Sequence, residues 1–303
     1  MSAPREGPGI VRLADPAAAA RWSAAERVAG RTIGFVPTMG ALHEGHLTLV
    51  RRAAAENDVA CASVFVNPLQ FDDPADLARY PRDFAGDAGL LEGAGCAMVF
   101  TGTLAGFFPG AADPAAIRRR DPGPAAAGLE GACRPGHFAG VVTIVERLFA
   151  AVRPRAAYFG EKDFQQCLVV RDLARSLGYP EIVLCPTSRD PDGLARSSRN
   201  AFLGAAERAR ALALSRALFA ARAAWARGLR DAGELEALLR ARLAEPGIEI
   251  EYAAVRDPAR WSADPPPGRL AQARALVAAR VGRVRLIDNL ALDEPDPAGE
   301  AAG

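Results

Sequence analysis

Two of the three histidines in the sequence, His43 and His46, stand three residues apart, directly after a β-prone run at residues 32–36. A helix is expected to follow, so the pair lies in a strand–turn–helix connection, where backbone N–H groups point toward an anion. Gly40 and Gly45 would let the backbone approach such a ligand closely. Residues three apart share a helix face, so both imidazoles could donate to one phosphate group and gain positive charge there. The pattern favours a phosphate-binding turn.

The same histidines have two other interpretations, a metal site and a structural role. The sequence has no third histidine, cysteine or carboxylate at ligand spacing nearby, and the i,i+4 spacing of a helical zinc pair is absent. A lone histidine near an apolar helix is usually structural, but here there are two. We rank phosphate binding above metal binding, and metal binding above a structural role.

A second strand–turn–helix unit carries the only lysine. Among 37 basic residues Lys162 alone is lysine, and its retention in an arginine-rich chain suggests a position that needs a compact ammonium. It stands in Gly160-Glu161-Lys162-Asp163, at the end of an expected strand at 156–160. Lys162 would neutralise phosphate charge, and Asp163 would hold a hydroxyl, a metal or that lysine. The alternative is a surface ion pair.

Amide side chains follow another expected strand. The apolar run at 59–66 is typical of a strand buried on both faces of a parallel sheet, and Asn67 and Gln70 come directly after it. Ligands of open α/β sheets bind at this edge, and neutral amides suit a ligand with hydroxyl and carboxylate groups. Hydrogen bonding within the turn beside Pro68 is the alternative, and it fits Asn67 better than Gln70.

A polar loop at 186–199 contains two hydroxyls and two arginines within four residues, Arg196-Ser197-Ser198-Arg199. This is a phosphate-binding composition at an expected helix start, although Ser197 could simply be a helix N-cap. His137 precedes another helix, and ligand contact and a capping or packing role remain open for it. The triplet at 118–120 is interpreted as solvated surface.

The order of expected elements predicts an α/β protein whose parallel sheet is followed by a smaller domain. The expected domains are residues 1–187, a smaller α+β domain at 188–292 and a disordered tail at 293–303. The further expected elements are strands near 95–100, 181–185, 249–255, 275–281 and 283–288, and helices near 16–29, 47–55, 83–92, 141–149, 164–177, 205–228 and 231–244.

Composition excludes several classes. With 303 residues, half of them hydrophobic, the chain is long enough for two domains with a sizeable core. A net charge of +1 gives no basic field for nucleic acid, and no apolar run reaches bilayer length. The N-terminus lacks the apolar core of a signal peptide, and five scattered cysteines are expected to be reduced thiols. We expect a cytoplasmic protein.

Taken together, the motifs closely resemble the pantoate–β-alanine ligase family, a member of the HIGH-signature nucleotidylyltransferase superfamily. His-x-Gly-His alone would indicate only the superfamily, whereas the amide block and the lysine block in this order are specific to the ligase. The resemblance covers roughly residues 30–292. It rests on Pro37-Thr-Met-Gly-Ala-Leu-His-Glu-Gly-His46, Phe65-Val-Asn-Pro-Leu-Gln-Phe71, Arg79-Tyr-Pro-Arg82, Phe138-Ala-Gly-Val141, Phe159-Gly-Glu-Lys-Asp-Phe-Gln-Gln166 and Asp192-Gly-Leu-Ala-Arg-Ser-Ser-Arg-Asn200.

The resemblance implies a Rossmann-like doubly wound sheet, usually in a homodimer, and a reaction in two halves. Pantoate carboxylate attacks the α-phosphorus of ATP, giving pantoyl adenylate and pyrophosphate. The amine of β-alanine then attacks the acyl carbon, which forms the amide and releases AMP. Mg²⁺ would arrive with ATP, held mainly by phosphate oxygens and water. Asp87 is a weaker candidate for that metal region.

The resemblance also implies the site residues. His46 would be the proton donor, with His43 and Lys162 as further catalytic groups on the phosphates, and Asp163 near the ribose. Gln70, Gln166 and Asn67 would bind pantoate, and Gln70 would also lie near β-alanine. The residues implied to bind ATP are Met39, Gly40, Ala41, Leu42, His43, Glu44, Gly45, His46, Gly160, Glu161, Lys162, Asp163, Ser188, Arg196, Ser197, Ser198 and Arg199.

Three residues depart from the family pattern. Arg196 replaces an apolar residue and would either contact phosphate or turn to solvent, Ser188 replaces a hydrophobic residue of the adenine pocket, and Phe108 replaces a tyrosine. None is one of the histidines, the lysine or the glutamines, so activity is expected with altered ATP affinity. The alternative functions are another adenylyl transferase, whose product keeps the nucleotide, and a non-catalytic nucleotide- or RNA-binding relative.

Overall fold

The computed structural model describes residues 9–111 and 113–294 of the chain. The chain divides into two compact units, and each is considered separately. The first unit contains the described part of residues 1–124 together with residues 134–160 and 166–186. The second contains residues 125–133 and 161–165 and the described part of residues 187–303. Two short segments from the middle of the chain therefore belong with its C-terminal part, which the unbroken ranges expected from the sequence do not include.

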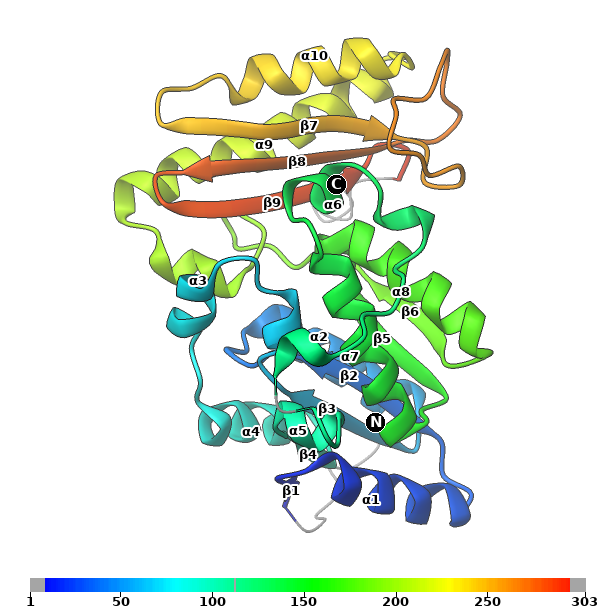
Figure 1. Ribbon diagram of the computed structural model, residues 1–303. Coiled ribbons are helices and arrows are strands. Elements are labelled where there is room, and N and C mark those ends of the chain that lie inside the picture. The colour runs from blue at the N-terminus through cyan, green and yellow to red at the C-terminus, as the bar shows by residue number, and fades with distance from the viewer. Residues whose placement is uncertain (1–8, 112, 295–303) are drawn as a thin grey trace, which may run out of the picture. The chain divides into compact units, whose positions relative to one another are not determined.

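The first unit is built on a six-stranded sheet in the order β1-β4-β3-β2-β5-β6 (Figure 1). All five pairs of neighbouring strands are parallel. The strands are β1 (Val11–Leu13), β2 (Ile33–Thr38), β3 (Val59–Val64), β4 (Met98–Phe100), β5 (Ala156–Gly160) and β6 (Glu181–Cys185). The chain winds outward from β2 in one direction and from β5 in the other, so the strand order reverses between these two neighbours. In a doubly wound sheet, this switch point is where ligands bind.

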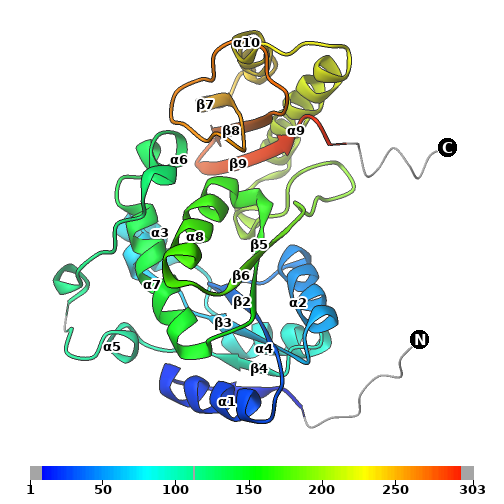
Figure 2. The ribbon, with the colours of Figure 1, turned by 90° about the vertical axis from the view of Figure 1, so that its right-hand side faces the viewer.

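Helices cover both faces of this sheet, and α2 and α7 lie on opposite sides of it (Figure 2). Side chains of β2 alternate between them: Val36 packs in a cluster with Val50 of α2, and Phe35 contacts Phe149 of α7 edge-on. The helices of this part are α1 (Pro16–Val28), α2 (Glu44–Glu56), α3 (Pro74–Arg79), α4 (Phe84–Gly93), α5 (Leu104–Phe107), α7 (His137–Val152) and all but the first two residues of α8 (Phe164–Leu177), with short 3₁₀ turns η1 (Pro68–Gln70) and η2 (Pro114–Ala116). A third 3₁₀ turn, η3 (Pro124–Ala126), has one residue in the first unit and two in the second. Burial on both faces explains the continuous apolar strands.

The second unit contains a three-stranded antiparallel sheet in the order β7-β8-β9. Its strands are β7 (Ile248–Arg256), β8 (Arg274–Val281) and β9 (Val284–Ala291), and its helices are α6 (Leu129–Cys133), α9 (Ala205–Ala226) and α10 (Ala232–Leu243), with 3₁₀ turns η4 (Glu161–Asp163) and η5 (Ser198–Phe202). Helices α9 and α10 pack on one face of the sheet, where leucines and alanines form a second core. Figure 1 shows both helices along this sheet.

The predicted fold class is confirmed, and most predicted elements lie within a few residues of the observed ones. Helix α8 and strands β5 and β6 have the predicted bounds. Strand β1 was not predicted, because three residues with two exposed side chains give no apolar run. The tail predicted from residue 293 lies, from residue 295 onward, outside the described residues. Within the described residues, no helix is long and apolar enough to cross a membrane.

Candidate active site

The histidine turn connects β2 to α2, and the two rings lie side by side with centroids 4.1 Å apart. His43 is the N-cap of α2, and its Nδ1 accepts a hydrogen bond from the N–H of Gly45 at 3.2 Å. Nδ1 of His46 accepts from the N–H of His43 at 3.3 Å. A ring nitrogen that accepts carries no proton, so each neutral imidazole carries its proton on Nε2. Both rings are thereby set as Nε2–H donors.

The backbone before these histidines is held by a buried carboxylate. Gly40 has a φ of +83°, and a Cβ there would lie 2.7 Å from Oδ2 of Asp87, so the position requires glycine. Asp87 accepts hydrogen bonds from the N–H groups of Ala41 at 3.1 Å and Leu42 at 2.9 Å. Burial raises the pKa of Asp87, and these two hydrogen bonds oppose the rise. Asp87 therefore anchors the histidine turn.

Asp87 was also a candidate for the region that would bind Mg²⁺, and its contacts in the structure can be compared with that expectation. Both carboxylate oxygens are engaged by the turn, one by each backbone N–H group. Across residues 9–111 and 113–294, no three histidine, cysteine, aspartate or glutamate side chains are grouped so as to hold a metal ion. The anchoring role was missed in the sequence because Asp87 lies 46 residues from Ala41.

The amide turn η1 is ordered by Asn67, which is buried with 1% of its surface exposed. Its Oδ1 accepts from the N–H of Leu69 at 3.1 Å, which is the turn-forming role considered above. Its Nδ2 donates to Oε1 of Gln70 at 2.9 Å and to the carbonyl of Gly140 at 3.1 Å. Because Asn67 donates to the carbonyl end of the Gln70 amide, the amide orientation is defined, and the NH₂ end is the one available to a ligand.

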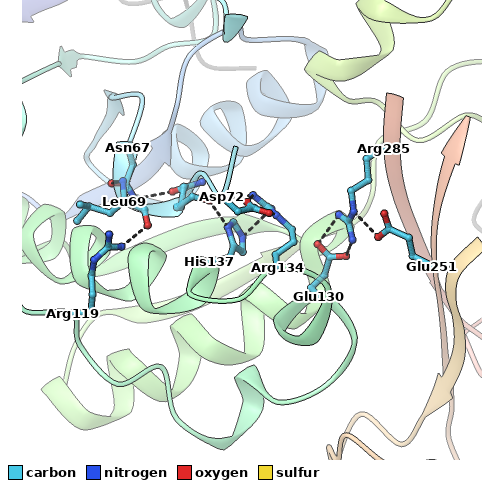
Figure 3. Close-up of polar contacts among 10 residues, drawn as sticks. Asn67, Leu69, Asp72, Arg119, Glu130, Arg134, His137, Glu251 and Arg285 are labelled. Carbon is cyan, nitrogen blue, oxygen red and sulfur yellow. Dashed lines mark hydrogen bonds and ion pairs between the residues drawn. The ribbon is translucent and has the colours of Figure 1, made fainter. Parts of the chain in front are cut away.

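The main chain at Gln70 is supported by His137 of α7 and by Arg134, which precedes that helix; Figure 3 shows these two side chains beside Asp72. Its carbonyl accepts from Nδ1 of His137 at 2.9 Å and from Nη2 of Arg134 at 3.1 Å, and Arg134 also pairs with Asp72 at 3.1 Å. Nη1 of Arg134 lies 3.2 Å from Nε2 of His137, which fits a ring protonated on Nδ1. Arg119 donates to the carbonyl of Leu69. The observed contacts of His137 thus support the Gln70 turn.

The lysine turn η4 follows β5 in the chain but belongs to the second unit. Nζ of Lys162 lies 3.6 Å from Oδ2 of Asp163, and the lysine side chain is 19% exposed against 47% for the aspartate. An ion pair therefore exists, but its lysine is largely buried rather than on the surface. Nδ2 of Asn289 donates to the carbonyls of Glu161 and Lys162, at 2.8 Å each.

The loop at 187–200 is a tight hairpin in the second unit, closed by a β-bridge between Arg189 and Ala195. Ser197 caps η5, with its hydroxyl accepting from the N–H of Arg199 at 3.3 Å. Arg189 makes a two-pronged ion pair with Asp288 of β9, at 2.6 and 2.9 Å. The hydroxyl–arginine segment is thus fixed to the small antiparallel sheet.

The structure shows the contacts of Arg196 and Phe108, two of the three residues that depart from the family pattern. Nε of Arg196 lies 3.0 Å from Oδ1 of Asp190, so its guanidinium pairs with a neighbouring carboxylate instead of extending into solvent. The backbone N–H of Arg196 donates to the carbonyl of Ser188 at 2.9 Å, across the hairpin. Phe108 is buried, with the guanidinium of Arg147 5.1 Å from its ring centroid.

The two glutamines after Lys162 are placed differently. Gln165 is buried; its Nε2 donates to carbonyls at Ala125, Ala127 and Gly128, and its Oε1 accepts from the N–H of Glu130. Gln166, the predicted pantoate ligand, is half-buried in the first turn of α8.

Glu130 holds a separate polar cluster in the second unit (Figure 3). It accepts from Arg285 at 2.6 and 3.0 Å and from the hydroxyl of Tyr252 at 2.9 Å. Burial would lower the pKa of Arg285, but the hydrogen bonds and charges of Glu130 and Glu251 outweigh burial and raise it. Glutamine is scarce in the sequence, which could have drawn attention to Gln165. Nothing local in the sequence indicated that Glu130 would be buried.

A parallel sheet with a histidine turn at its switch point places the protein in the Rossmann-like α/β class. The family model of the pantoate–β-alanine ligases matches residues 12–291, and the chain belongs to this family. A pantothenate synthetase of Rubrobacter xylanophilus is 50% identical over 279 residues, which cover 90% of this chain and 94% of the relative. One of Mycolicibacterium smegmatis is 49% identical and covers 94% of this chain and 88% of the relative.

Solved structures agree with this assignment. The pantothenate synthetase of Thermus thermophilus superposes with a TM-score of 0.84 at 43% identity, covering 93% of this chain and 99% of that one. A pantoate–β-alanine ligase of Francisella tularensis, solved with an ATP species and β-alanine, has a TM-score of 0.75 at 30% identity, covering 94% and 99%. The predicted family and ligase activity are confirmed: the chain is an enzyme that condenses pantoate with β-alanine at the expense of ATP.

Proposed function

We propose that the chain carries out this condensation with His43, His46 and Lys162 on the phosphates of ATP, through a pantoyl adenylate. The proposal rests on strands β2 and β5, which are parallel neighbours at the switch point of the sheet. The histidine turn follows β2, and the lysine turn follows β5. Phosphoryl transfer needs mainly positioning and neutralisation of developing charge, which two donor rings and one ammonium would supply.

In the first half-reaction, a carboxylate oxygen of pantoate bonds to the α-phosphorus of ATP while the bond to the bridging oxygen breaks and pyrophosphate leaves. Residues 39–46 would receive the nucleotide, and His46 would donate to the leaving phosphate through Nε2. The acceptor role of Nδ1 in both rings supports this assignment, because it directs the ring protons to Nε2. The backbone of residues 160–163, Ser188 and residues 196–199 would complete the ATP site, with Asp163 near the ribose.

Pantoate would be bound by Gln70 and Gln166. The hydrogen bond from Asn67 orients the Gln70 amide so that its NH₂ group can donate to a hydroxyl or carboxylate. Asn67 would then act on pantoate through Gln70. β-Alanine would bind near Gln70, and its deprotonated amine would attack the acyl carbon, lose a proton and displace AMP.

The remaining parts of the proposal concern the metal, the assembly and the compartment. Mg²⁺ would enter as the ATP complex and be held mainly by phosphate oxygens and water, with Asp87, whose oxygens already accept from the histidine turn, as the weaker candidate. The protein would act as a homodimer in the cytoplasm. Five free thiols fit a reducing compartment.

Pantoate-dependent exchange of labelled pyrophosphate into ATP tests the adenylate. We expect exchange with pantoate and Mg²⁺ and without β-alanine, and release of AMP only when both substrates are present. Exchange that proceeds equally with other hydroxy acids would contradict the assignment of pantoate. A product that retains the nucleotide would indicate a different adenylyl transferase, and a lack of any exchange would indicate a non-catalytic nucleotide-binding protein.

A further inference from the structure

The lysine turn is fastened by two polar side chains of the small antiparallel sheet, Asn289 of β9 and Arg274 of β8. Both are buried, with 3% and 5% of their surface exposed. Leu276 pairs with Asn289 across the two strands, and Arg274 is two residues from Leu276, so Arg274 and Asn289 share one face of the sheet. Buried polar groups are costly to leave unpaired, and among the side-chain nitrogens and oxygens of these two residues only Nε of Arg274 lacks a hydrogen-bond partner.

Asn289 makes three hydrogen bonds with its side-chain amide. Its Nδ2 donates to the carbonyls of Glu161 and Lys162, each at 2.8 Å, and its Oδ1 accepts from Nη1 of Arg274 at 2.7 Å. A guanidinium can only donate, so Arg274 must face the oxygen of the amide, and the NH₂ group must face the two carbonyls. The two peptide groups on either side of the Lys162 Cα are thereby fixed.

Arg274 holds the same turn by two further contacts. Its Nη2 donates to the carboxylate of Glu161 at 3.0 Å, and its guanidinium lies 4.0 Å from the ring centroid of Phe164, directly after the turn. The turn is therefore held at its first residue, at the backbone of Lys162 and at the residue that follows. Lys162 uses its own side chain in none of these contacts.

We propose that Asn289, oriented by Arg274, is a positioning residue that sets where the Lys162 ammonium stands during adenylate formation. This inference rests on the proposed role of Lys162 on the phosphates. A preorganised charge works only in the correct place, and a displacement of about 1 Å can lower a rate by roughly 10²-fold. Asn289 acts through the backbone and touches no substrate.

The test uses Asn289→Asp, which keeps the shape of the side chain but replaces the donating NH₂ with an oxygen. We expect kcat for pantoate-dependent exchange to fall about 10²-fold while KM for pantoate stays within about twofold. Tyr252→Phe is the control, because it removes one buried hydrogen bond of the same unit, to Glu130, and none of the bonds made to residues 161–163. Its kcat should stay within about twofold of wild type, even at a similar loss of melting temperature.

A second variant and a double mutant separate positioning from general damage. Asn289→Ser removes both donations without adding charge, so it replaces Asn289→Asp if that variant does not fold. In a Lys162→Ala background, either Asn289 change should slow exchange no further, because both act through one ammonium. The positioning role would be overturned if the rate losses of the Lys162 and Asn289 changes multiplied in the double mutant. It would also be overturned if an Asn289 variant were as fast as Tyr252→Phe. Normal exchange by Lys162→Ala would instead overturn the proposed function.

Discussion

The amide turn η1 packs against helix α7 at Gly140, and the substitution Gly140→Ala tests how much this close packing matters. An ideal Cβ at this position would lie 2.0 Å from the carbonyl oxygen of Leu69 and 2.8 Å from the backbone nitrogen of Gln70. Ordinary non-bonded contacts are roughly 3.5 Å, so α7 and η1 would have to separate by more than about 1 Å. The neighbours are backbone atoms, which cannot rotate away as a flexible side chain could.

Gly89→Ala is the matched control. Gly89 also lies in a helix, α4, and a Cβ there would have no heavy atom within 4 Å. Both substitutions gain about 1 kcal/mol of helix propensity, so the difference between them is the steric cost at Gly140. Overpacking costs about 1–3 kcal/mol, and the backbone clash puts this case near 3 kcal/mol. The melting temperatures of the two variants should differ by roughly 6–12 °C.

Thermal unfolding and exchange kinetics measure both consequences. The separation would also move Gln70 from the position in which we propose that it binds pantoate, so kcat/KM for pantoate should fall by up to roughly 10²-fold in Gly140→Ala and stay unchanged in Gly89→Ala. Equal melting temperatures and equal pantoate kinetics for the two variants would refute the inference that close packing of α7 on η1 sets the site.

Three further substitutions test single contacts. Lys162→Ala should lower pantoate-dependent exchange roughly 10²-fold by removing a preorganised charge, and near-normal exchange would exclude the role on phosphate. Gln70→Ala should raise KM for pantoate about tenfold with KM for ATP unchanged in steady-state assays; an unchanged pantoate dependence would remove Gln70 from the site. Asp87→Asn loses one charge-assisted hydrogen bond, about 1.5–3 kcal/mol, so KM for ATP should rise about tenfold or more; an unaltered KM would show that the histidine turn holds its shape without Asp87.

Local patterns in the sequence were enough to predict the order of strands and helices. Apolar runs marked the buried strands, and Gly178 after the last periodic residue marked the end of α8, which has the predicted bounds. The histidine spacing likewise predicted a shared face, which the 4.1 Å ring separation confirms. That His43 would cap α2 was not predicted, because histidine is not among the preferred capping residues.

The supporting contacts could not be predicted, because their partners are far apart in the chain. Asn289 lies 127 residues after Lys162, and nothing in the local pattern of β9 indicates what its side chain contacts. Asparagine is scarce in this chain, and each of the four asparagines was therefore a candidate functional residue. Only Asn67 and Asn200, however, stood in motif-like contexts. Conversely, the hydroxyl–arginine pattern could not show that Arg196 would pair with Asp190.

The assignment of residues 161–165 to the second unit has a consequence for synthesis of the protein. A fragment that stops at residue 186 would contain every strand of the six-stranded sheet, yet its Lys162 would lack both Asn289 and Arg274. On the ribosome, β8 and β9 are made after every strand of the six-stranded sheet, so the contacts that hold the Lys162 backbone form only after that sheet has been synthesised. A chain cut before β8 should therefore lose pantoate-dependent exchange while leaving its larger sheet able to form.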